Sequence, residues 1–330
     1  MDGSHIDVDR HAPARCFVLN LGWSAIFYGA DLAPELDSCA ELQPSSASLV
    51  ERDEQDASGE HELRGETLSL LRGVRELAQL AALAERLPPD LPQVLLLDGN
   101  LGLWNVSRGA ISRRMRDRFI YEEGGLLPAL NAARRLAEER TLACGAYTSA
   151  PGTAEVVHAL RAGVCPMDEP VCTRCPGLGR PLRPCDDVGL TTDAELFEAL
   201  LAPGERSAVF QATSRAFLRT DQPRTPPWYE QEGHTIAFFY LRLADEVARV
   251  ETPLWLAQRP ERVGLLHAAL LDQCEKGPGY PVALQEAHEQ AVITTVDRRS
   301  FAALLERELE RAGTAFAGTA KSRSKRVRTI

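Results

Sequence analysis

A short apolar run near the end of the first third of the chain constrains the fold more than any other segment. Residues Val94 to Leu97 are all branched and apolar, and Asp98-Gly99-Asn100 follows them directly. A run of this length that ends in a turn signal predicts a central strand covered on both faces. Such a strand needs helices on both sides of its sheet, so the sequence predicts an α/β fold. The 330 residues are sufficient to bury a core of this kind.

The segments around this strand have the periodicities of an α/β chain. Apolar residues recur every three or four positions in 61–86, which predicts a long helix that ends before Pro88-Pro89. An acidic, serine-rich loop is expected before residue 60. The expected strands are one or two within 12–30, another at 142–148, and a hairpin formed by 235–243 and 247–252. The other expected helices lie at 124–140, 151–161, 260–275, 284–292 and 298–312.

Changes in composition predict four parts of the chain. Residues 163–187 hold four cysteines, five prolines and three glycines, which is typical of a loop-rich insertion. We therefore expect one α/β domain formed by 1–162 and 235–316, a cysteine-containing insertion at 163–234, and a disordered basic tail at 317–330. There is no internal repeat.

Composition and charge exclude several classes of protein. No apolar run approaches the roughly 18 residues needed to span a bilayer, and the first residues lack a secretion signal, so we expect a cytoplasmic protein with reduced thiols. The formal net charge of −10 disfavours a polyanionic partner on average. The charge is segregated, however. Eleven acidic and two basic residues lie between Asp31 and Glu66, whereas five basic residues and no acidic ones lie in the last ten. Any contact with phosphate is therefore expected to be local.

Four cysteines of the insertion have a spacing that suits a metal centre. They form the pattern Cys-x6-Cys-x2-Cys-x9-Cys, and thiolates two residues apart can bind one ion from a single turn. The pattern predicts zinc or an iron–sulfur cluster, with four free thiols as the alternative. The predicted ligands are Cys165, Cys172, Cys175 and Cys185. The remaining cysteines, at 16, 39, 144 and 274, are interpreted as core thiols or bystanders.

Acidic residues at two Asp-Gly dipeptides suggest a second kind of metal site. Asp2-Gly3 opens the chain, Asp98-Gly99 ends the central strand, and Glu76 lies on the helix between them. Carboxylates at strand ends hold Mg²⁺ or Mn²⁺ in many phosphodiester hydrolases. Asp-Gly is also a common turn dipeptide, and a helical Glu is often only solvated. His288, one turn into a helix after a Gly-Pro turn, could contact phosphate or move a proton, or be structural.

Taken together, these segments resemble a known family. They include Asp2-Gly-Ser-His-Ile-Asp, Val94-Leu-Leu-Leu-Asp-Gly-Asn and Ala146-Tyr-Thr-Ser-Ala-Pro-Gly-Thr. Further along the chain come Phe238-Phe-Tyr-Leu with Glu246-Val-Ala-Arg-Val-Glu-Thr-Pro, then Gly279-Tyr-Pro with Glu286-Ala-His, and the basic C-terminal run. In this order they resemble the NurA family of DNA repair nucleases, partners of the HerA translocase, and specifically its bacterial branch. The resemblance covers essentially the whole chain.

The resemblance implies a ribonuclease-H-like core, with a mixed sheet flanked by helices. It also implies that Asp2, Glu76 and Asp98 bind Mn²⁺ or Mg²⁺, and that Tyr280 and His288 close the same site. Glu62 and Glu66 lie on the same predicted helix, and Glu76 is preferred because it follows Arg72 by one turn. The family has a strand before its first Asp-Gly motif, whereas this chain begins one residue before Asp2.

The implied activity is that of a metal-dependent deoxyribonuclease that degrades DNA ends. It would be an exonuclease, with endonuclease activity as a further possibility. The resemblance implies a homodimer docked on a hexameric HerA-like ATPase, which would supply the energy because the chain has no Gly-x4-Gly-Lys-Ser/Thr motif. The basic tail would contact DNA phosphates through Lys321, Arg323, Lys325 and Arg326. Two alternatives stay open: a catalytically degenerate DNA-binding scaffold or adaptor of a HerA-type complex, and a hydrolase of RNA or small molecules.

Overall fold

The computed structural model describes residues 1–7, 16–43, 50–52, 60–101, 113–168, 170–212 and 228–313. The described chain forms two compact units, which are considered separately. The first comprises Met1–Pro88, Leu103–Leu136 and Ala283–Ile330, and the second comprises Pro89–Gly102 and Ala137–Val282. The predicted α/β class is confirmed, with a mixed sheet flanked by helices. The ribonuclease-H-like connectivity and the division at residues 162, 234 and 316 stay predictions, and the predicted tail lies outside the described residues.

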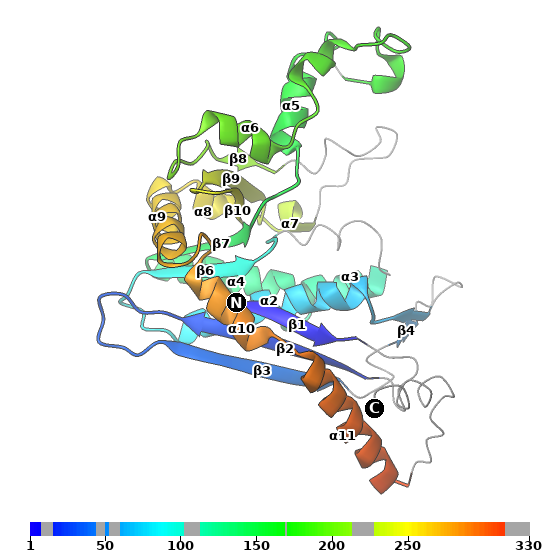
Figure 1. The fold of residues 1–330 in the computed structure, drawn as a ribbon, viewed down its shortest axis with the longest axis vertical. Helices are drawn as coiled ribbons and strands as arrows, with labels where there is room; N and C mark the ends of the chain where they lie inside the picture. Colours follow the sequence, from blue (N-terminus) through cyan, green and yellow to red (C-terminus); the bar gives the residue numbers. More distant parts are fainter. Residues whose placement is uncertain are drawn as a thin grey trace. The chain divides into compact units, whose positions relative to one another are not determined.

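An antiparallel sheet is the centre of the first unit (Figure 1). Its strands are β1 (Asp2–Ile6), β2 (Phe17–Ala25) and β3 (Glu35–Gln43), in that order, and Asp2 pairs with Gly22. Alternate residues of β2 are buried, as expected for a strand with one face on the core. The expected loop before residue 60 is wrong, because β3 and the short hairpin of β4 (Val50–Arg52) and β5 (Glu60–Glu62) lie there.

Helices pack against both faces of this sheet. Helix α2 (Glu66–Arg86) contacts β1 and β2 and begins five residues later than predicted. Helix α10 (Val282–Ala291) lies across β1 and β2. Gly22 faces α10, and so does Asp2, which pairs with it. Gly3 follows Asp2 and faces α2, so the two helices lie on opposite faces of the sheet. The remaining helices are α3 (Arg113–Tyr121), which was not predicted, α4 (Leu126–Glu139), and α11 (Thr295–Arg311).

Helix α10 rests directly on the backbone of β2. A Cβ atom on Gly22 would lie 2.4 Å from both the carbonyl oxygen of Ala287 and the amide nitrogen of Ala291. Beside it, the Asn20 amide donates hydrogen bonds to the last carbonyls of α10, at 2.9 Å for Ala291. Ser4 donates its hydroxyl to the same Ala291 carbonyl. These bonds satisfy carbonyls at the helix C-terminus that have no partner within the helix.

A five-stranded mixed sheet is the centre of the second unit. Its order is β6-β7-β10-β9-β8, with β6 and β7 parallel and the other pairs antiparallel. The strands are β6 (Gln93–Asp98), β7 (Leu142–Thr148), β8 (Phe210–Gln211), β9 (Ile236–Arg242) and β10 (Val247–Pro253). Nearly every residue of β7, β9 and β10 is buried, so both faces are covered. The predicted hairpin is confirmed, and a strand does form at Val94–Leu97. Its predicted central position is wrong, because β6 is at the edge of the described sheet, although Leu95 to Leu97 are buried.

Helices of the second unit cover this sheet. Helix α9 (Pro260–Lys276) packs on β6 and β7, and α6 (Asp193–Leu200) packs on β9 and β10. Helix α6 was not predicted, although Thr192 and Glu195 form a capping box at its start. The other elements are α5 (Glu155–Gly163), α7 (Trp228–Gln231), α8 (Leu254–Ala257), and the 3₁₀ turns η2 (Cys172–Arg174) and η3 (Pro184–Val188). Within the described parts of the chain, no helix has the length and apolarity that a membrane crossing requires.

The contact between α10 and β2 predicts a large effect of a small substitution. Gly22→Ala should lower the free energy of unfolding by about 1–3 kcal/mol, because the new methyl group meets backbone atoms that cannot rotate away. Gly264→Ala is the matched control, because Gly264 lies in helix α9 with open space around it. It should raise stability by about 0.5–1 kcal/mol. Urea denaturation followed by circular dichroism measures both, and equal stability of Gly22→Ala and wild type would contradict the close contact.

Candidate active site

Strand β1 and helix α10 bring Asp2 and His288 together. The imidazole Nδ1 of His288 lies 2.7 Å from Oδ2 of Asp2, and the other carboxylate oxygen accepts the amide proton of Gly3 at 2.7 Å. Because an ionised carboxylate only accepts hydrogen bonds, Nδ1 carries the proton in this contact. Asp2 is buried, whereas the His288 side chain is 59% exposed. The carboxylate is therefore held in place by a side chain that reaches solvent.

Helix α2 brings Glu76 to the same end of β1 from the other face. Glu76 is 3% exposed, and its Oε1 lies 3.1 Å from Nε of Arg72. A Cβ atom on Gly3 would lie only 2.5 Å from this Oε1, so the carboxylate is seated against the strand backbone. Glycine follows Asp2 because of this close approach, and not because the chain turns there. Glu66 is exposed, and the side chain of Glu62 lies outside the described residues.

In the second unit, Asp98 and Tyr280 both lie beside Tyr147. Asp98 is half-buried at the end of β6 and pairs with Tyr147 of β7, and Gly99 follows it with φ +100°. The Tyr280 ring packs edge-on against the Tyr147 ring, with centroids 5.4 Å apart. The Tyr147 hydroxyl donates to Oε1 of Glu246 at 2.7 Å. Burial, together with this bond, raises the pKa of Tyr147 above its ordinary value, so the hydroxyl stays protonated.

The carboxylates fit a hard divalent cation in their donor chemistry. Asp2 and Glu76 offer carboxylate oxygens buried at the first residues of β1, and Mn²⁺ and Mg²⁺ prefer oxygen ligands. Within the described residues, no three His, Cys, Asp or Glu side chains are gathered tightly enough to hold one ion. The structure places Asp2, Glu76 and His288 in the first unit and Asp98 and Tyr280 in the second. Convergence of all five on one cation stays a prediction.

None of the four cysteines of the insertion forms a disulfide in the described structure. Cys172 is exposed, and Cys165, Cys175 and Cys185 are half-buried. The sulfur of Cys175 accepts the amide proton of Gly177 at 3.3 Å, and that of Cys185 lies 3.6 Å from Nη2 of Arg161. No described trio of potential ligands is gathered around a common point here either. A zinc or iron–sulfur centre therefore stays a prediction.

The other predicted sites have mixed outcomes. Cys16, Cys144 and Cys274 are buried, as expected for core thiols, whereas Cys39 is exposed on β3. The basic residues Lys321, Arg323, Lys325 and Arg326 lie outside the described residues.

Sequence reasoning also missed several polar residues near the candidate site. Tyr147 packs against Tyr280 and donates to Glu246, and Arg249 and Glu251 form an ion pair within β10. A signal for the last two is present in Val247-Ala-Arg-Val-Glu-Thr-Pro, where charged residues alternate with apolar ones. Alternation of this kind is typical of a strand with one polar face, but here that face is buried.

Comparison with known proteins identifies the family. A model described as the NurA domain matches residues 1–293. The chain belongs to the NurA family. The crystal structure of the NurA nuclease from Sulfolobus solfataricus is similar, with a TM-score of 0.50 and 14% sequence identity over 94% of this chain and 83% of that chain. A comparison with curated proteins gives no match. At this identity the Sulfolobus NurA structure supports the fold. The resemblance to the NurA family drawn from the sequence motifs is confirmed, whereas the bacterial branch and the HerA partner stay predictions.

The close approach of Glu76 to Gly3 in this NurA-family chain gives a test of the Glu76 assignment. Gly3→Ala should push the Glu76 carboxylate aside, because the added methyl group would otherwise lie 2.5 Å from its oxygen. We expect the Mn²⁺ concentration for half-maximal binding, measured by electron paramagnetic resonance, to rise about tenfold. Gly152→Ala, which has open space at its Cβ position, is the control. Glu66→Gln should have no effect, and a loss of Mn²⁺ binding in that variant would favour Glu66 as the ligand.

Thiol labelling tests the predicted cysteine centre. Iodoacetamide at pH 8 should modify the exposed Cys39 and Cys172 but not Cys144 or Cys274, since burial raises their thiol pKa values to about 12 and about 11. Added zinc should protect the four insertion cysteines and leave Cys39 reactive. Mass spectrometry of peptides reads out each position. Equal labelling of the four cysteines with and without zinc would show that they are free thiols.

Proposed function

We propose that this chain is a divalent-cation-dependent deoxyribonuclease that processes DNA ends, chiefly as an exonuclease. The observation that carries the proposal is the NurA domain match over residues 1–293, within which the motif residues Asp2 and Glu76 are buried carboxylates at one strand end. The similar Sulfolobus protein is described as a nuclease. A buried carboxylate is costly to keep ionised, so its presence favours a role in binding a cation.

Each motif residue would have its own role in this activity. Asp2, Glu76 and Asp98 would hold Mn²⁺ or Mg²⁺. When bound, the cation supplies an acidified water and charge stabilisation for the phosphodiester oxygens. His288 orients the Asp2 carboxylate through Nδ1, and its exposed ring is available to contact a phosphate or to move a proton. Tyr280 is oriented by the edge-on contact with the protonated Tyr147.

The family resemblance also supports a proposal for partners. We propose that the chain acts in the cytoplasm as a homodimer, together with a HerA-like hexameric ATPase. The ATPase would supply the energy, because the sequence itself lacks a Gly-x4-Gly-Lys-Ser/Thr motif. Contacts with DNA phosphates would come from Lys321, Arg323, Lys325 and Arg326, which are local exceptions to the acidic average. Co-purification of tagged protein with a HerA-like ATPase, followed by mass measurement of the complex, tests this part separately.

Substitution of Asp98 tests the catalytic assignment. Asp98→Asn removes the anionic ligand at almost unchanged volume, so folding should survive. We expect DNA cleavage to fall about 10³-fold, because loss of cation binding removes several kcal/mol of transition-state stabilisation. Release of nucleotides from linear duplex DNA measures the rate, with Asp90→Asn as an exposed control near the start of β6. Full activity in folded Asp98→Asn protein would show that Asp98 is not a ligand.

A substrate panel separates this proposal from its rivals. Wild-type protein is incubated with linear duplex DNA, single-stranded DNA and RNA, in Mn²⁺, in Mg²⁺ and in EDTA. Cleavage of DNA that requires the cation supports the nuclease. DNA binding without cleavage under every condition would support the scaffold, and cleavage of RNA alone would support an RNA hydrolase.

A further inference from the structure

Strand β10 carries two charged side chains that are fully enclosed. Arg249 is 3% exposed and Glu251 is 0% exposed, and they point to the same face because they are two residues apart. Burial of an ion pair costs desolvation energy that hydrophobic residues of similar size would avoid. Buried charges of this kind therefore call for a role beyond packing.

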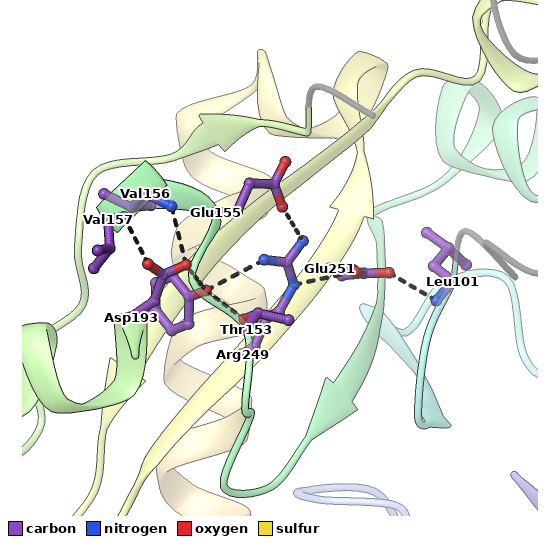
Figure 2. A network of polar contacts seen from close by, with 9 residues as sticks. Leu101, Thr153, Glu155, Val156, Val157, Asp193, Arg249 and Glu251 are labelled. Atoms are coloured by element: carbon purple, nitrogen blue, oxygen red, sulfur yellow. Dashed lines mark hydrogen bonds and ion pairs between the residues drawn. The ribbon is translucent and has the colours of Figure 1, made fainter. Parts of the chain in front are cut away.

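The contacts of Arg249 join several parts of the second unit (Figure 2). Its Nε lies 3.1 Å from Oε1 of Glu251, and its Nη2 lies 3.1 Å from Oε2 of Glu155 at the start of α5. Its Nη1 reaches the Tyr240 hydroxyl at 3.3 Å, and its guanidinium carbon lies 3.7 Å above the Phe238 ring centroid. Arg249 is thus held on every side and cannot swing away from Glu251.

The second oxygen of Glu251 reaches out of the network to the loop that follows β6. Its Oε2 accepts the amide proton of Leu101 at 3.0 Å (Figure 2). Leu101 is three residues after Asp98. Hydrogen bonds to charged acceptors are stronger than neutral ones, and both residues of this one are buried.

Two further hydrogen bonds fix the same turn from β7. The Gly99 amide donates to the Tyr147 carbonyl at 2.9 Å, and the Thr148 hydroxyl donates to the Gly99 carbonyl at 2.8 Å. Both act on the first half of the turn. Glu251 acts on the second half, so that the segment from Asp98 to Leu101 is held at both ends.

We propose that Glu251, locked by Arg249, is a positioning residue that fixes the Asp98 turn and thereby aims the Asp98 carboxylate at its cation. This inference rests on the proposed function, in which Asp98 is a cation ligand. Glu251 is fully buried, and each of its oxygens accepts a hydrogen bond from a protein donor, so we assign it a positioning role and not that of a ligand.

The chemistry of Glu251 explains why an amide would not replace it. A glutamine has one side-chain oxygen, which can accept from either the Leu101 amide or the Arg249 guanidinium. Its NH₂ group would then face the remaining N–H group, and two donors cannot form a hydrogen bond. Glu251→Gln keeps the volume and loses one of the two bonds. Glu251→Ala loses both, and leaves Arg249 with Glu155 as its remaining carboxylate partner.

The experiment compares variants that disturb the same network at different places. Asp193→Asn is the matched control, because Asp193 is fully buried and accepts from Tyr240 and from the amides of Val156 and Val157, but does not touch the Asp98 turn. Three measurements are made on the full chain: melting temperature, Mn²⁺ affinity by electron paramagnetic resonance, and amide hydrogen exchange of the peptide that contains residues 99–101.

We expect Glu251→Gln and Glu251→Ala to weaken Mn²⁺ binding by about tenfold or more and to speed exchange of the 99–101 amides. Asp193→Asn should lower the melting temperature as much as the Glu251 variants do, because it also removes a buried carboxylate from the network. Its Mn²⁺ affinity should stay within about twofold of wild type. If Glu251→Ala does not fold, the isosteric Gln variant decides. Wild-type Mn²⁺ affinity in folded Glu251→Gln, or an equal loss of affinity in Asp193→Asn, would overturn the positioning role.

Asp98→Asn, measured in parallel, separates this inference from the proposed function. Weak Mn²⁺ binding in Asp98→Asn with normal binding in both Glu251 variants would overturn the inference alone. Normal binding in Asp98→Asn would overturn both, because Asp98 would then not be a ligand.

Discussion

Helix α10 rests on the bare backbone of β2 at Gly22, and the candidate site of the first unit depends on this contact. Any side chain at that position would hold the helix away from the strand, because its carbonyl and amide atoms lie where a Cβ would be. The same helix carries His288, whose ring reaches Asp2, the residue paired with Gly22. Asn20 and Ser4 close the contact by binding the last carbonyl of the helix. The position of the Asp2 carboxylate is therefore set by a glycine on the neighbouring strand.

The two Asp-Gly dipeptides show that one sequence pattern can have two physical causes. Gly99 has φ +100°, a backbone conformation that other residues rarely adopt, so it is required by the turn after β6. Gly3 lies within a regular strand and is required because the Glu76 carboxylate occupies the space of a side chain. A reading from sequence treats both dipeptides as turn signals. Only Asp98-Gly99 is a turn; Asp2-Gly3 lies within strand β1.

Much of the fold could be predicted because its strongest elements are locally encoded. The apolar run of β6 and the periodic apolar positions of α2 are visible in the sequence alone. Strand β3 was missed because acidic residues and exposed positions dominate it, although Leu36, Ala40 and Leu42 lie at even spacing. The partners of the candidate residues could not be predicted either. Arg249 meets Glu155 across 94 positions, and His288 meets Asp2 across 286, distances over which local patterns carry no information.

The first unit is discontinuous in sequence, so its parts are synthesised at different times. Asp2 on β1 is synthesised 286 residues before His288, which lies on the helix that packs against it. Synthesis at about 5–20 residues per second separates these two residues by about 14–57 s. Until then Asp2 has no imidazole beside it, and a chain that stops before residue 283 never acquires one. The contact between Asp2 and His288 therefore forms only after residue 288 has been synthesised, and a translation product that stops earlier lacks it.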